Sequence, residues 1–69
     1  MNYYRIRKNY EEKLFNKQMV RQAYEKNVIS IAEYYSIVKS VEDKDVPEGM
    51  TKEEFEKLLK DICKKAGIL

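Results

Sequence analysis

Apolar side chains recur every three or four residues in four stretches of the chain, which is the spacing of one face of an α-helix. In the first stretch, Tyr3, Ile6, Tyr10 and Leu14 form this stripe and predict a helix over about residues 3–14. The basic residues of the stretch precede its glutamates, which is the reverse of the order that a helix dipole favours. An extended beginning with a later helix start is therefore the alternative.

The second stretch predicts a helix over about residues 17–26. Asn16 is suited to cap its N-terminus, and Phe15 and Val20 stand at the spacing of a hydrophobic staple. The expected buried stripe is Met19, Val20, Ala23 and Tyr24, with Lys17, Arg21 and Glu25 facing outward. Asn27 tolerates the left-handed conformation and should end the helix, with Val28 folded back over its last turn.

The third stretch has a stronger start signal, because Ser30 and Glu33 have the spacing of a capping box. Ile29 and Tyr34 supply a second staple, and the apolar residues that follow predict a helix over about residues 31–40. Few residues separate this helix from the one before it, so the two should cross at a large angle and bury their facing stripes. The sequence therefore predicts a tight helical hairpin at residues 16–39.

The fourth stretch follows an acidic linker at residues 40–50 that contains Pro47 and Gly49. Thr51 and Glu54 form a second capping box, which predicts a helix over about residues 52–66 that ends at Gly67. The apolar stripe of this helix is expected to be Phe55, Leu58, Leu59, Ile62 and Ala66. The predicted fold is an all-α bundle of four short helices in a single domain, residues 1–69.

Composition agrees with a small helical domain. The 69 residues are 43% hydrophobic and 38% charged, with two glycines and one proline, a balance that favours helix over strand and turn. No apolar run approaches the roughly 20 residues of a membrane span, and the N-terminus lacks the apolar core of a signal peptide. We therefore expect a soluble, cytoplasmic protein. The single Cys63 cannot form an internal disulfide, in agreement with a reducing compartment.

Charge is unevenly distributed. Residues 1–39 carry eight Lys and Arg against four Glu, whereas residues 40–50 carry one Lys against four acids. The basic side chains that could contact phosphate or an acidic partner are Arg5, Arg7, Lys8, Lys13, Lys17 and Arg21. The acidic run lacks the residue order of a calcium loop and is expected to be a solvated linker.

Residue types bear on catalysis and metal binding as well. The chain has no His and one Cys, too few ligands for a zinc site and no partner for a nucleophilic thiol. Cys63 follows Ile62 in the last helix and is expected to be a small core residue. We predict no catalytic residues, no metal or cofactor, and a protein that is not an enzyme.

The predicted hairpin has the outline of a helix-turn-helix DNA-binding motif. Its second helix, however, lacks the Arg, Asn and Gln side chains that read base edges. The residues that this helix would present are Ile31, Ala32, Glu33, Ser36 and Lys39. A small DNA-binding regulator is therefore the alternative function, with nucleic acid as the alternative partner.

Six tyrosines are an unusual number for so short a chain. Tyr10, Tyr24 and Tyr34 fall in the predicted core stripes, whereas the others fall at stripe edges, where a half-buried phenol often marks a contact surface. The expected partner surface, for self-association or for another protein, is Tyr3, Tyr4, Tyr35 and Ile37. The alternative is that the last helix covers Tyr35 and Ile37.

Residues 2–38 resemble the XkdX family of small phage and prophage proteins, which have an aromatic N-terminus, a basic segment and a short helical hairpin. The matching residues are Tyr3, Tyr4, Arg5-Ile6-Arg7, Tyr10, Leu14-Phe15-Asn16, Met19-Val20, Ala23, Asn27-Val28-Ile29-Ser30, Glu33-Tyr34 and Ile37. Asn27 stands where the family usually has Gly, and a linker with a further helix replaces the family's closing segment.

The resemblance implies a phage or prophage origin in a Gram-positive host, and it points to no particular activity, because the family has no established biochemical function. We therefore expect a non-enzymatic protein that acts through protein–protein interaction, as a minor tail-module component or a small host-directed binder. Its partner would be a phage protein, a host protein or a second copy of the chain. It would work in the bacterial cytoplasm or in association with the virion.

Overall fold

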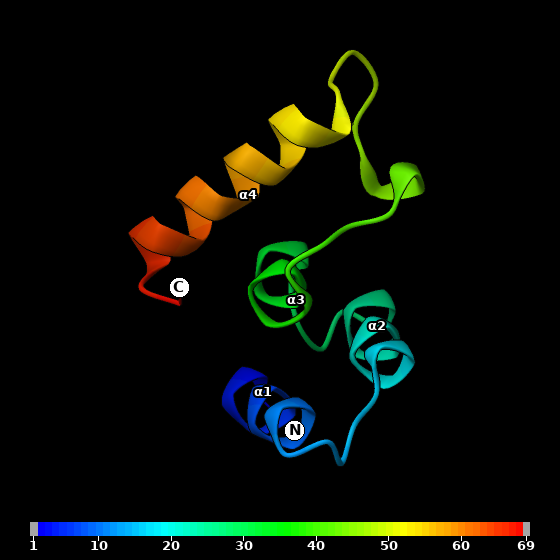
Figure 1. Cartoon of the computed structure of the whole chain (residues 1–69), viewed down its shortest axis with the longest axis vertical. Coiled ribbons are helices and arrows are strands. Elements are labelled where there is room, and N and C mark those ends of the chain that lie inside the picture. The colour runs from blue at the N-terminus through cyan, green and yellow to red at the C-terminus, as the bar shows by residue number, and fades with distance from the viewer. Residues whose placement is uncertain (1, 69) are drawn as a thin grey trace.

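The computed structural model describes residues 2–68, in which the chain forms four α-helices and one short 3-10 turn. The elements are α1 (Tyr3–Glu11), α2 (Lys17–Glu25), α3 (Ile31–Val38), η1 (Asp43–Asp45) and α4 (Lys52–Ala66). Figure 1 shows α3 in the middle of the molecule, with α1 and α2 to one side and α4 to the other. The predicted all-α bundle is confirmed. None of the helices in residues 2–68 is both long and apolar enough to cross a membrane.

Directly before each α-helix lies a residue whose side chain accepts a hydrogen bond from the backbone N–H three residues further on. Asn16, Ser30 and Thr51 cap α2, α3 and α4 as predicted, and the last two form complete capping boxes. Asn2 caps α1 in the same way, which was not foreseen. Because this cap fixes the start of α1 at Tyr3, the alternative of a late helix start is wrong.

Two of the corners between helices share one hydrogen-bond pattern. At the end of α2, Asn27 is left-handed (φ 62°), and the N–H of Val28 donates to the Ala23 carbonyl at 2.9 Å. This is a Schellman ending, and the prediction for Asn27 is confirmed. At the end of α1, Lys13 (φ 63°) and Leu14 repeat the pattern. Leu14 thus lies beyond α1 and is 67% exposed, so its predicted place in the buried stripe is wrong.

The helix α3 also ends earlier than predicted, because Lys39 adopts a left-handed conformation (φ 66°) directly after Val38. The N–H of Lys39 still donates to the Tyr35 carbonyl, at 2.7 Å. Gly67 ends α4 in the same conformation, as predicted (φ 74°). A residue without a Cβ adopts this conformation at no steric cost, whereas a lysine there is mildly strained.

The first of two apolar clusters lies between α1, α2 and α3. Its buried members are Tyr3, Ile6, Val20, Ile29, Tyr34 and Ile37. The predicted hydrophobic staple of Ile29 and Tyr34 lies in this cluster. The staple of Phe15 and Val20 does too, with Phe15 only partly buried. On α2, however, Met19 is exposed and Arg21 is buried, so both predictions for these side chains are wrong. The reason is an ion pair that draws Arg21 inward, described below.

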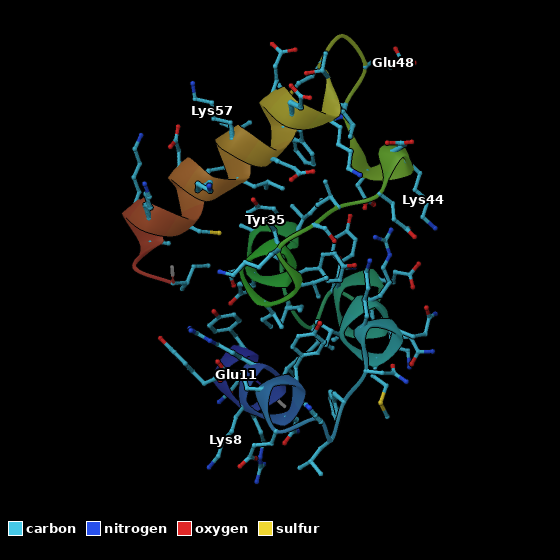
Figure 2. All side chains as sticks on the ribbon, in the orientation of Figure 1. Lys8, Glu11, Tyr35, Lys44, Glu48 and Lys57 are labelled. Atoms are coloured by element: carbon cyan, nitrogen blue, oxygen red, sulfur yellow. The ribbon has the colours of Figure 1, made fainter. Side chains whose placement is uncertain are left out.

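The second cluster lies between α3 and α4, and its buried members are Tyr35, Val41, Phe55, Leu59 and Cys63. Figure 2 shows Tyr35 between these two helices. The buried face of α4 thus consists of every fourth residue, Phe55, Leu59 and Cys63, and it is narrower than predicted. Leu58, Ile62 and Ala66 are exposed instead of buried. The reason is that α4 packs chiefly against a single helix, which covers only part of its apolar arc.

Candidate functional site

Three of the four residues predicted to form a partner surface are buried. Tyr3, Tyr35 and Ile37 each expose less than a tenth of their area, so that prediction is wrong for them, and only Tyr4 is exposed, at 72%. The alternative, that the last helix covers the other face of α3, holds for Tyr35. It does not hold for Ile37, which packs in the cluster of α1, α2 and α3.

The buried Tyr3 has a structural role. Its hydroxyl lies 2.9 Å from Ser36 Oγ and 3.4 Å from the carbonyl oxygen of Ile68, and it accepts a hydrogen bond from Arg7. Ser36 Oγ in turn donates to the Glu33 carbonyl at 2.7 Å. The phenol therefore ties α1 to α3 and to Ile68, two residues beyond the end of α4, which explains why a tyrosine lies at this position in the core.

The predicted phosphate contacts divide into three groups. Arg5, Lys8, Lys13 and Lys17 are exposed, as a contact to a charged partner would require. Arg7 is partly buried and lies 3.7 Å from a carboxylate oxygen of Glu11, its neighbour one turn on. Arg21 is buried, so its predicted role as an outward phosphate contact is wrong.

The helix that a helix-turn-helix would use to read DNA is α3, and α3 is covered on both sides (Figure 1). Ser36 is buried, and the carboxylate of Glu33 is held by the backbone N–H of Ser30 at 2.8 Å. Ile31 and Ala32 pack against the cluster shared with α4. Of the residues that were expected to face bases, only Lys39 is exposed.

The least expected feature is a buried ion pair that joins α2 to the acidic linker. The two terminal nitrogens of Arg21 donate to the two carboxylate oxygens of Asp45 at 2.7 and 2.8 Å. The side chains expose only 8% and 5% of their area, and Glu42 adds a third oxygen at 3.3 Å from Arg21. Asp45 also accepts the backbone N–H of Glu42 at 3.0 Å. The prediction of a solvated linker is therefore wrong for Asp45.

Two tyrosines complete the surroundings of Arg21. The rings of Tyr24 and Tyr34 are stacked with centroids 5.4 Å apart, and the guanidinium carbon lies 5.3 and 5.4 Å from these centroids. Such cation–π contacts favour the charged arginine away from water. Within residues 2–68, Arg21 Nε and the Tyr34 hydroxyl are buried without a hydrogen-bond partner, which opposes part of this gain. We call the four residues Arg21, Tyr24, Tyr34 and Asp45 the Arg21 clamp.

The ion pair also changes how both of its groups titrate. The hydrogen bonds from Arg21 lower the pKa of Asp45 below its usual value, against the effect of burial, which raises it. The same hydrogen bonds raise the pKa of Arg21. Both groups therefore carry full charge at neutral pH, and the linker turn is held to α2 by two charge-assisted hydrogen bonds.

Cys63 is a core residue, as predicted. It is fully buried, and its thiol donates to the Ala32 carbonyl at 3.1 Å across the contact between α4 and α3. Burial raises the pKa of this thiol, which disfavours the nucleophilic thiolate. No group of three or more His, Cys, Asp or Glu side chains in the described part of the chain is placed to hold a metal ion.

Exposed large apolar side chains are the remaining candidates for a functional surface, and they are Tyr4, Leu14, Met19, Val28, Leu58 and Ile62. Leu58 and Ile62 differ from the others because they lie one turn apart on one flank of α4, where they are 44% and 43% exposed. We call this pair the α4 ridge. The apolar stripe that the sequence predicts for α4 is broader than one packing partner can cover. This breadth is the feature of the sequence from which the ridge could have been predicted.

No family model matches the chain, and neither a curated protein nor a solved structure does. The resemblance to the XkdX family therefore rests on the pattern of residues 2–38 alone.

Substitution of Arg21 by Met should be among the most damaging single changes in the molecule, because it leaves the Asp45 carboxylate buried without its cation. We expect a loss of about 3–5 kcal/mol in the free energy of unfolding, measured by urea denaturation. The double change Arg21→Met with Asp45→Leu should recover most of this loss. Lys44→Ala, which removes an exposed pair with Glu42, should change stability by less than about 1 kcal/mol. Equal losses for Arg21→Met and Lys44→Ala would contradict the clamp.

The lowered pKa of Asp45 makes the contribution of the clamp depend on pH. A carboxyl group whose pKa is lower in the folded than in the unfolded state stabilises the fold above the unfolded pKa of about 3.9. That stabilisation is lost as the pH falls through the lower, folded pKa of Asp45. Thermal melts should therefore show wild type more stable than Asp45→Asn at pH 7, with the difference shrinking steadily below about pH 4. A difference that is independent of pH would contradict this assignment.

Proposed function

We propose that the protein is a non-enzymatic phage or prophage protein that works by binding a protein through the α4 ridge. The observation that carries the proposal is the exposure of Leu58 and Ile62 together on a helix whose other large apolar side chains are buried. Apolar groups grouped on a surface in this way are typical of interaction sites, whereas single exposed ones are ordinary.

The phage assignment is supported by the resemblance of residues 2–38, and the proposed roles are a minor tail-module component or a host-directed binder. The helix α4 lies beyond the stretch that carries this resemblance. We therefore assign the packed hairpin to the scaffold and α4 to the contact that is particular to this protein.

The size of the ridge sets the strength of the expected contact. Complete burial of a Leu or Ile side chain contributes about 1.5–3 kcal/mol, so covering the exposed part of each would contribute about 1 kcal/mol. This is too little for a tight complex, and the charged residues beside the ridge must supply orientation and specificity. We expect a contact of modest affinity.

Site-specific photo-crosslinking tests the proposal directly. A benzophenone amino acid at position 62 should crosslink to a protein in bacterial cells that carry the phage or prophage. The same probe at position 57 should crosslink far less, because Lys57 lies on a different side of α4, about 100° around the helix axis from Leu58. The partner that crosslinks can then be purified, and its affinity for the chain should fall at least tenfold when Leu58→Ser and Ile62→Ser are combined. Equal crosslinking at both positions would contradict the proposal.

The alternative function, DNA binding, makes a different prediction in a salt titration. Arg5 and Lys8 are exposed on α1, and phosphate contacts by such residues weaken steeply as salt rises. Tight, salt-dependent binding to duplex DNA that is lost on Arg5→Ala with Lys8→Ala would favour the regulator and overturn the proposed protein contact. We expect only weak binding, because α3 is covered and cannot enter the major groove.

A further inference from the structure

Building on the proposed function, we infer that the α4 ridge binds the α4 helix of a second copy of the chain, packed antiparallel about a two-fold axis. Three properties of α4 favour this contact: its exposed flank, the order of the charges along that flank, and the absence of ion pairs at these charges within the described residues.

The flank is continuous along the helix. Glu54, Leu58, Asp61 and Lys65 follow one another at spacings of four, three and four residues, which places them on one side of a helix. Ile62 lies beside Leu58 on the same side, one turn further on. Glu54, Asp61 and Lys65 are all exposed, so the whole row is accessible. In Figure 1, α4 lies at the edge of the molecule, away from α1 and α2.

Charge order along this flank selects the orientation of the partner. The first turn of α4 carries Glu53 and Glu54, and the last turn carries Lys64 and Lys65. Two parallel copies would place glutamate against glutamate and lysine against lysine. Two antiparallel copies place the acidic end of each helix against the basic end of the other. The charged ends of the two helices are therefore complementary only when the helices run antiparallel.

A single two-fold axis can form both the apolar contact and the charged contacts. A two-fold axis midway between Leu58 and Ile62 sets Leu58 of one copy against Ile62 of the other. Glu54 and Lys65 lie at nearly equal distances on opposite sides of that midpoint, so the same axis brings Glu54 of one copy beside Lys65 of the other. One operation thus pairs the ridge with itself and the two ends with each other, as an isologous interface requires. It also brings the Asp61 of each copy close to that of the other, a like-charge contact that weakens the dimer.

The charged groups of the flank are available for this contact. Within residues 2–68, no ion pair involves Asp61 or Lys65, and Glu54 uses one carboxylate oxygen, at 3.0 Å, to accept the Thr51 N–H. The contact consists of a single pair of short helices, so the surface area that it buries should be well below the roughly 1,200 Å² of a stable interface. We therefore expect a weak dimer, with a dissociation constant on the order of 0.1 mM.

Sedimentation velocity of the full chain between about 0.01 and 1 mM, in low salt, tests the inference at the concentrations that such a weak contact requires. Wild type should shift from monomer to dimer as its concentration rises. Leu58→Ser with Ile62→Ser should raise the dissociation constant at least tenfold. The matched control is Leu14→Ser with Val28→Ser, which removes similar apolar area from the helix corners and should change it less than twofold. Circular dichroism should show that both variants keep the helical fold.

Charge reversal tests the antiparallel orientation. Glu54→Lys alone and Lys65→Glu alone should each weaken the dimer, because each places like charges together. The double variant should restore it, since the reversed charges face each other again across the two-fold axis. Glu54→Lys also removes half of the capping box, so its helix content must be compared with wild type.

Several outcomes overturn the inference. These are a chain that stays monomeric at 1 mM, a ridge variant that dimerises as well as the control, or a double reversal that restores nothing. A monomeric chain that crosslinks at position 62 to a different protein would overturn the second-copy inference and leave the proposed function standing. A monomeric chain that crosslinks to no protein at position 62 would overturn both.

Discussion

The bidentate ion pair between Arg21 and Asp45 is the interaction on which the arrangement of the outer elements depends. It joins two residues that are 24 positions apart, one on α2 and one in the linker turn η1. Because both side chains are nearly fully buried, separating them would leave a charge in an apolar environment, at a far higher cost than for an exposed pair. The clamp therefore fixes the course of the linker over α2, and with it the point from which α4 begins.

The position of α3 follows from the two apolar clusters. Consecutive residues of this helix belong to different clusters, with Tyr34 in the cluster of α1 and α2 and Tyr35 in the cluster of α4. A helix that is apolar on most of its faces must be covered on most of them. The buried hydroxyl of Ser36 is hydrogen-bonded to Glu33 and Tyr3. Since α3 is occupied with packing, surfaces for binding are left to the outer helices, and α4 carries the only pair of large exposed apolar side chains spaced one turn apart within a helix of the described chain.

Local features could be predicted from the sequence, because their partners lie within a few residues. The caps at Asn16, Ser30 and Thr51 and the left-handed Asn27 are of this kind, and the structure confirms them. Nothing local tells Arg21 from the other basic residues, since its partner is a carboxylate in a distant acidic run.

The width of a helix's buried face is also not determined by the residues of that helix alone. The stripe of α4 was expected to include Leu58 and Ile62, but how much of it is covered depends on how many helices pack against α4. The expected partner surface failed for the same reason, because Tyr35 and Ile37 are covered by elements that the spacing of α3 alone does not reveal.

The Arg21 clamp holds the linker and so keeps α4 on α3, with the α4 ridge facing outward. Amide hydrogen exchange, followed residue by residue in wild type and Asp45→Asn, tests this claim most directly. In the variant, the amides of α4 should exchange at least tenfold faster through local opening, while those of Tyr34 and its neighbours in α3 change much less. Equal acceleration in all four helices, or none in α4, would contradict the claim.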